Sequence, residues 1–281
     1  MDAVNRQVMH NIVKLINYFY ILSTNVRMIM QGKKGYIVTA LLFLSLISIS
    51  CQDTTGKSRM PDKQGRAHLI EQGLFGRDEK MGEWMQVSSV RVDPDSSRRL
   101  ISTPGSGVLL NGPLGKSIDL QTSADYGDMR AHVEFLIPHG SNSGVYFMGR
   151  YEIQILDSYG QEKPKYSDCG GIYQRWDENR EPKGYEGHAP LVNAARPPGE
   201  WQTFDVVFRA PHFDATGQKT SNARFEEVVH NGTVVHKEIE VTGPTRAATY
   251  DDEQPVGPLM LQGDHGPVAY RNIWVEPLSK E

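Results

Sequence analysis

The segment 141-SNSGVYFMGRYEIQILDSYG-160 combines the pattern of a buried strand with ionisable side chains in its middle. The side chains at positions 151, 153 and 155 are aromatic or apolar, whereas Arg150, Glu152 and Gln154 occupy the alternate positions. Successive side chains of a strand point to opposite faces, so this spacing predicts one face against a hydrophobic core and one polar face. The polar face either lines a cleft or meets solvent.

Ten short segments with strand composition recur between turn signals, and no long amphipathic helix is evident after residue 100. They are 106–111, 116–122, 129–138, 144–150, 151–157, 201–211, 223–232, 233–241, 257–263 and 268–277. The dipeptide Asn231-Gly232 favours a tight hairpin turn, because both residues tolerate a positive φ. Many short strands at this spacing predict a β-sandwich, and the aperiodic segment 158–199 predicts a loop that serves a binding site or lid.

The N-terminal region has the features of an export signal. Two lysines precede the apolar run 36–50, which ends in small residues directly before Cys51. This pattern is typical of a secretory signal, and the run is short for a membrane span. The letters ISISC resemble a bacterial lipoprotein signal, which predicts lipidation of Cys51. Residues 1–29 fit no part of such a signal, so we expect translation to begin at Met28 or Met30; a single N-terminal amphipathic or membrane helix is the alternative.

The predicted organisation is a signal peptide over residues 1–50, a lipidated Cys51 with a polar tether over 51–67, and one domain over 68–281. Residues 1–50 contain five basic residues and one acidic residue, which leaves 25 basic and 33 acidic residues and a formal charge of −8 on the mature chain. An acidic chain without a basic block disfavours nucleic-acid binding. We expect an exported protein, in the periplasm or at the cell surface, anchored to the membrane as a lipoprotein.

Six motifs that run in order over residues 75–278 together resemble the 3-keto-disaccharide hydrolase domain family. They are 125-DYGDMRAHVEF-135, 142-NSGVYFMGRYEIQILDSYG-160, 168-DCGGIY-173, 198-PGEWQTFDVVFRAPHFD-214, 230-HNGTVV-235 and 259-LMLQGDHGPVAYRNIWVEPL-278. The resemblance implies an all-β fold, a jelly-roll β-sandwich of the concanavalin-like lectin/glucanase type with a concave sheet that holds saccharide. It also implies a hydrolase or lyase that acts on sugars oxidised to a ketone at carbon 3, and a sugar 3-dehydrogenase that supplies them.

A ketone at carbon 3 makes the hydrogen on carbon 2 acidic, because the carbanion is delocalised as an enolate. Cleavage then needs a base, a cation or donor for the enolate oxygen, and an acid for the leaving group. We expect Glu152 to act as general base or acid and Arg150 to stabilise negative charge, although an exposed ion pair is the alternative. His265, in 262-QGDHG-266, is the second acid/base candidate, since histidine titrates near neutral pH; a turn histidine bonded to backbone is its alternative.

The same strand resembles the Glu-x-Asp-x-x-Glu strand of laminarinase-type glucanases, with Glu152, Gln154 and Asp157 at the matching positions. A β-bulge near Leu156 would bring Asp157 onto the face of Glu152. Because a Gln replaces the central carboxylate and an Asp replaces the second Glu, the pattern disfavours double displacement, which needs carboxyl groups about 5 to 5.5 Å apart.

Further side chains are expected to bind the sugar. They are Asn142, Ser143, Gln154, Asp157, Asp168, Tyr173, Trp176 and His188. Ordinary turn chemistry and loop packing are the alternatives for these positions. The histidines show no zinc-ligand spacing, and we expect no metal or cofactor beyond a structural Ca²⁺ that sandwiches of this type can hold. Two other functions stay open, a non-catalytic carbohydrate-binding sandwich and a laminarinase-type endo-glucanase.

Overall fold

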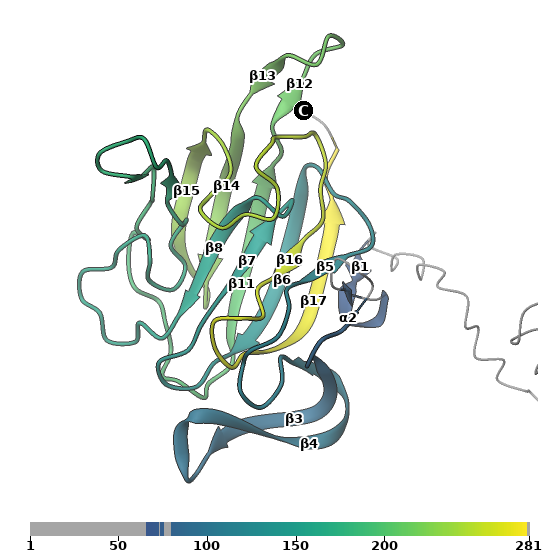
Figure 1. Cartoon of the computed structure of the whole chain (residues 1–281), viewed down its shortest axis with the longest axis vertical. Helices are drawn as coiled ribbons and strands as arrows, with labels where there is room; N and C mark the ends of the chain where they lie inside the picture. The colour runs from purple at the N-terminus through teal and green to yellow at the C-terminus, as the bar shows by residue number, and fades with distance from the viewer. Residues whose placement is uncertain (1–65, 73, 76–79, 280–281) are drawn as a thin grey trace, which may run out of the picture. The chain divides into compact units, whose positions relative to one another are not determined.

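The computed structural model describes residues 66–72, 74–75 and 80–279, which form two antiparallel sheets (Figure 1). The larger sheet has the order β15 (Thr233–Val241), β14 (Ala223–His230), β11 (Gln202–Arg209), β6 (Met129–Leu136), β17 (Ala269–Pro277), β4 (Ser96–Leu110) and β3 (Met85–Asp93), and β1 (Ala67–His68) also pairs with β17. The smaller sheet has the order β2 (Leu74–Phe75), β5 (Leu120–Thr122), β16 (Met260–Leu261), β7 (Asn142–Phe147) and β8 (Tyr151–Leu156). Three short elements lie outside these sheets: the hairpin of β9 (Arg175–Trp176) and β10 (Gly184–Tyr185), the hairpin of β12 (His212–Phe213) and β13 (Lys219–Ser221), and the one-turn helix α2 (Leu69–Gln72).

The two sheets pack face to face through aromatic and aliphatic side chains. The Phe147 ring on β7 lies 5.2 Å from the Phe208 ring on β11, and the Tyr151 ring on β8 lies 5.5 Å from Phe208. Ile153 and Ile155 on β8 are fully buried in the same core. The alternation that the sequence shows along β8 is therefore present, and its polar side chains are on the face opposite the core. The predicted all-β jelly-roll sandwich is confirmed.

Each of the ten predicted strands overlaps an observed strand, although 116–122 and 257–263 are strand over three and two residues only. β3 and the first half of β4 were not predicted, because this hairpin is mostly exposed and lacks a clear apolar alternation. Asn231 and Gly232 have φ values of 52° and 81° between β14 and β15, which confirms the predicted tight turn.

The segment 158–199 covers the free edge of β8. The backbone N–H of Gln154 donates to the carbonyl of Gly171 at 2.8 Å, and the N–H of Tyr173 donates to the carbonyl of Glu152 at 3.1 Å. The N–H of Gly170 completes this ladder by donating to the carbonyl of Gln154 at 2.8 Å. These bonds hold Tyr173 beside Glu152, so the segment predicted to serve a site does border the polar face of β8.

The predicted signal peptide, Cys51 and most of the predicted tether lie outside the described residues. Ala67, the last residue of the predicted tether, already pairs with Val275 of β17 and so belongs to the sandwich. Within the part of the chain that the structure describes, no helix has the length and apolar composition needed to cross a membrane.

Candidate active site

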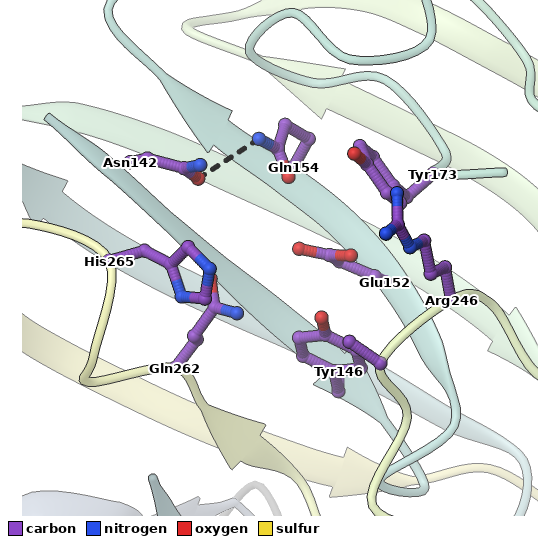
Figure 2. Close-up of a pocket in the computed structure, with 9 residues that line it drawn as sticks. Asn142, Tyr146, Glu152, Gln154, Tyr173, Arg246, Gln262 and His265 are labelled. Carbon is purple, nitrogen blue, oxygen red and sulfur yellow. Dashed lines mark hydrogen bonds between the residues drawn. The ribbon is translucent and has the colours of Figure 1, made fainter. Parts of the chain in front are cut away.

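A cavity of about 260 Å³ opens over the outer face of β7 and β8 (Figure 2). Its walls come from the two strands, from the segment 158–199 and from the loops on either side of β16. The lining residues are Asn142, Tyr146, Glu152, Gln154, Tyr173, Arg246, Ala247, Gln262 and His265. The cavity therefore brings together five of the residues predicted to act on or bind the sugar, namely Asn142, Glu152, Gln154, Tyr173 and His265.

Glu152 is the buried acid of this cavity, with only 3% of its surface exposed. Burial raises the pKa of its carboxyl to about 8, because a charged carboxylate is poorly solvated there; a hydrogen bond from Tyr146 opposes this shift and the charge of Asp119 adds to it. Tyr146 faces Glu152 directly across the β7–β8 pair. At neutral pH the Glu152 side chain is mostly protonated, so it can donate a proton.

Gly144 makes room for this carboxyl group. A Cβ atom at Gly144 would lie 2.3 Å from Oε1 of Glu152, which is closer than atoms can approach. Any larger residue at position 144 would push the carboxyl group away, so the glycine fixes where the acid sits. The N–H of Gln262 donates to the carbonyl of Gly144 at 3.0 Å and ties the β16 end of the wall to β7.

Side-chain amides and an imidazole form the opposite part of the wall. The Gln154 amide donates to Oδ1 of Asn142 at 3.0 Å, so two predicted sugar-binding residues are held as a pair. His265 Nδ1 is hydrogen-bonded to the carboxylate of Asp264. Because Nδ1 is engaged, Nε2 is the ring nitrogen that can exchange a proton with a ligand. In Figure 2 the His265 ring and the Glu152 carboxyl group lie on either side of the open space.

The buried Asn111 anchors the loop that carries His265. Its amide donates to the carbonyls of Gly263 and Gly266 at 3.0 and 2.7 Å, and its Oδ1 accepts from the N–H of Val268 at 2.8 Å. Asn111 has no exposed surface. Three hydrogen bonds from one buried side chain therefore fix the backbone on both sides of His265.

Arg150 lies away from the cavity, which corrects the prediction that it faces the reacting sugar. Its Nη2 forms an ion pair with Asp252 at 2.7 Å and its Nη1 donates to the carbonyl of Met148 at 2.8 Å. The guanidinium also lies 4.7 Å from the centre of the Tyr250 ring. Arg150 follows the β7–β8 turn and precedes the first residue of β8, so its side chain ties the turn to the loop 250–254 instead of joining Glu152.

The predictions for Asp157 and Ser143 are also corrected. Pairing of β7 with β8 runs without a register shift from Asn142 opposite Leu156 to Phe147 opposite Tyr151, so the expected bulge is absent from this pair. Asp157 lies beyond the strand, where it accepts from the N–H of Gly140 at 2.9 Å and pairs with His139 at 2.7 Å. Ser143 is fully buried, and its hydroxyl bonds to Tyr270 and to the Gln262 carbonyl, so it cannot reach a sugar.

Three other predicted residues lie in the segment 158–199 but do not line the cavity. Asp168 accepts a hydrogen bond from the N–H of Lys165 within its own loop. The backbone of His188 pairs with Ile172, next to the edge of β8. Trp176 lies partly exposed on β9. Contacts of these side chains with a longer sugar stay a prediction.

Three residues that line the cavity were not predicted from the sequence, namely Tyr146, Arg246 and Gln262. Tyr146 could have been found, because it shares its strand parity with Gly144 and so belongs to the polar face of β7. Gln262 lies in the quoted turn 262–266 and was not assigned. Arg246 lies in a loop with no periodic pattern, and no signal in the sequence pointed to it.

No group of three or more His, Cys, Asp and Glu side chains is arranged to hold a metal ion within the described ranges. Cys169 is buried in the core, and burial raises the pKa of its thiol to about 12. A thiol with so high a pKa is not a nucleophile at neutral pH.

Membership of a domain family places this protein among the carbohydrate-active enzymes. More closely, the chain belongs to the 3-keto-alpha-glucoside-1,2-lyase-like domain family, which it matches over residues 73–276. The resemblance drawn from the six motifs is thereby confirmed. No curated protein sequence matches the chain closely enough to count as a relative.

The chain is also similar to three solved structures. A candidate glycosyl hydrolase from Parabacteroides distasonis has 25% sequence identity and a TM-score of 0.49, with 70% of this chain and 82% of that chain covered. An endo-beta-1,4-glucuronan lyase from the fungus Trichoderma reesei has 12% identity and a TM-score of 0.37, with 73% and 90% covered. A carbohydrate-binding module from Bacillus subtilis has 10% identity and a TM-score of 0.32, with 70% and 96% covered.

Proposed function

We propose that this enzyme cleaves the glycosidic bond of 3-keto sugars, such as 3-keto-disaccharides or 3-keto-glucosides, by acid–base chemistry through an enolate. Membership of the family supports the substrate class. The observation that carries the acid–base part is the buried Glu152 carboxyl group, whose pKa of about 8 keeps it protonated at neutral pH, in one cavity with the His265 imidazole. An elimination requires one group that accepts a proton and another that donates one.

Glu152 is the general acid in this proposal and His265 is the general base. His265 uses Nε2, because Asp264 occupies Nδ1 and stabilises the imidazolium that forms. Tyr146 is bonded to Glu152 and favours its charged form, so it stabilises the carboxylate that remains after proton donation. The Gln262 amide lines the same cavity and can donate to the enolate oxygen.

The proposed reaction proceeds in two bond-breaking steps. The proton on carbon 2 passes to Nε2 of His265, and the electron pair of the C–H bond is delocalised onto the ketone oxygen as an enolate. The bond between carbon 1 and the glycosidic oxygen then breaks with its electron pair on that oxygen, which takes the proton of Glu152. The products are an alcohol and a 3-keto sugar with a double bond between carbons 1 and 2, and addition of water to that bond gives the hydrolysis product.

The laminarinase-type alternative is not favoured by this cavity. Double displacement needs a second carboxyl group about 5 to 5.5 Å from the first. Glu152 is the one carboxyl residue among the nine that line the cavity. A non-catalytic binding sandwich does not need a buried carboxyl group. Burial of such a group costs stability, and strongly shifted pKa values gather at functional sites.

Two variants test the assignment of acid and base. The wild-type protein is incubated in deuterated water with a 3-keto-glucoside and, in parallel, with the unoxidised glucoside, and NMR follows cleavage and exchange at carbon 2. Glu152→Gln should lose cleavage but keep exchange, because His265 remains; His265→Asn should lose both. Loss of exchange in Glu152→Gln would assign the base role to Glu152 instead. Equal cleavage of the unoxidised glucoside would refute the enolate route, and binding without any cleavage would favour the binding sandwich.

We also propose that the enzyme is exported and held at the membrane by a lipid on Cys51, and that a sugar 3-dehydrogenase supplies its substrate. The apolar run 36–50 before Cys51 supports export. Mass spectrometry of the mature protein should find a lipidated N-terminal cysteine. Cys51→Ser should move the protein from the membrane fraction to the soluble fraction, and an unchanged distribution would contradict lipid anchoring.

A further inference from the structure

Arg246 gives the cavity a positive charge that no acidic residue in its lining offsets. Of the eight other lining residues, Glu152 is mostly protonated near pH 7, His265 carries an imidazole, and the remaining six are of uncharged types. Figure 2 shows the Arg246 guanidinium beside Tyr173, at the end of the cavity away from His265. A cavity with this charge distribution attracts an anion.

The backbone around Arg246 is fixed to the strand that carries the acid. The N–H of Arg246 donates to the carbonyl of Gln174 at 2.8 Å. The neighbouring Thr245 donates its hydroxyl to the carbonyl of Arg150 at 3.0 Å and accepts from the N–H of Glu152 at 3.2 Å. Arg246 therefore keeps a defined position relative to Glu152, which a recognition residue needs.

The guanidinium of Arg246 is held by an aromatic ring and not by a carboxylate. It stacks over Trp176 with 4.1 Å between the guanidinium carbon and the ring centre. Glu178, which acts electrostatically on Arg246, is itself bonded to Lys183 at 2.6 Å and to Nε1 of Trp176 at 2.7 Å. Stacking uses the face of a guanidinium and leaves the N–H groups at its edge available.

Other arginines of this region contrast with Arg246. Arg150 forms an ion pair with Asp252, and Arg175 pairs with Glu186 at 3.4 Å. Within residues 66–72, 74–75 and 80–279, no side-chain hydrogen bond or ion pair of Arg246 to a protein group is found, and its side chain is exposed. The planar fork of N–H groups matches a carboxylate, which it can bind through two parallel hydrogen bonds.

We propose that Arg246 binds the carboxylate of a uronic acid, so that the natural substrate is a glycoside containing a uronic acid unit at the Arg246 end of the cavity. The inference rests on the proposed function, since it takes the Glu152 cavity to be the sugar site. The side-chain amides and tyrosine hydroxyls along the rest of the wall suit the hydroxyl groups of the same sugar. Sulfated and phosphorylated sugars are the competing anions.

Calorimetry with non-reacting sugars tests this proposal apart from catalysis. Wild-type protein is titrated with methyl β-glucuronide, methyl β-glucoside and methyl β-glucoside 6-sulfate. The glucuronide should bind about tenfold or more tightly than the glucoside, the range that one charge-assisted contact provides, and the preference should weaken as salt is added. Arg246→Gln should remove the preference for the glucuronide over the glucoside, and Arg246→Lys should keep part of it.

Arg180→Gln is the matched control, because Arg180 also stacks on an aromatic ring of the segment 158–199, 4.1 Å from the centre of Tyr185, but does not line the cavity. It should leave the preference unchanged. Equal affinity for the glucuronide and the glucoside, stronger binding of the 6-sulfate, or a preference that survives in Arg246→Gln would each overturn the proposal. Failure of the proposed function would be seen in a different measurement, namely as absence of cleavage of 3-keto-glycosides, whatever the binding preference.

Discussion

Substitution of Gly144 by alanine tests whether the position of the Glu152 carboxyl group controls the reaction. The added Cβ would lie 2.3 Å from Oε1 of Glu152, and such contacts essentially never fall under 3.0 Å, so the carboxyl group must move by at least 0.7 Å. A displacement of about 1 Å of a catalytic group can lower the rate on the order of a hundredfold. We expect Gly144→Ala to lower kcat/KM for a 3-keto-glucoside by about one to two orders of magnitude.

The assay compares kcat/KM and the thermal unfolding midpoint of Gly144→Ala with those of Gly217→Ala. Gly217 lies between β12 and β13 with φ of 82° and no atom near its added Cβ, so alanine there strains the backbone without touching the cavity. Gly217→Ala should lose some stability and keep its activity. A Gly144→Ala protein that is folded and retains full activity would refute the argument that the glycine sets the position of the acid.

Three further predictions concern stability. The pKa of Glu152 is about 8 in the folded protein against 4.5 normally, so between these pH values the folded state keeps a proton that the unfolded chain releases. The contribution of Glu152 to the free energy of unfolding should therefore fall by about 1.4 kcal/mol for each unit by which the pH rises from 4.5 to 8. Urea denaturation of Glu152→Gln should lack this decline. Burial lowers the pKa of His132, but hydrogen bonds and ion pairs to Asp205 and Glu134 outweigh it, so the pKa is raised above 6.5. The stability that these two carboxylates give the folded protein is therefore fully present below pH 6.5 and is lost as the pH rises through the raised pKa. Asp205→Asn should lower the unfolding temperature more at pH 5.5 than at pH 8.5. Asn111→Ala removes three buried hydrogen bonds, so the free energy of unfolding measured by urea denaturation should fall by about 3 kcal/mol. The kcat should also fall, because the loop that carries His265 is no longer anchored. An unchanged kcat would show that Asn111 does not help to position His265.

The sequence predicted the elements whose side chains alternate against the core. β8 was found because Tyr151, Ile153 and Ile155 alternate with Glu152 and Gln154, and the same alternation predicted the face on which the acid lies. β3 and the first half of β4 were missed because most of their side chains meet solvent, so burial imposes no pattern on them. Periodicity reports contact with the core and says little about strands outside it.

The site was harder to predict than the fold, because long-range contacts decide which polar residues share a cavity. Arg150 has the parity of Glu152, yet Asp252, about a hundred residues later, draws its guanidinium away. Arg246 reaches the cavity from a loop without periodicity, which a backbone hydrogen bond to Gln174 holds in place. Neither partner can be read from local spacing, whereas His265 was found because its turn formed part of a recognisable motif.

The backbone ladder between residues 170–173 and the edge of β8 has a consequence for how this enzyme can change. An uncovered β8 would present unpaired main-chain groups to other molecules, which is a route to aggregation. The segment that closes this edge also supplies Tyr173 to the cavity. A new sugar preference can therefore arise by exchanging side chains on this segment. Deleting the segment to open the cavity would expose the edge of β8 and lower the solubility of the protein. Engineering of specificity should keep the main chain of 170–173 and vary the side chain of Tyr173.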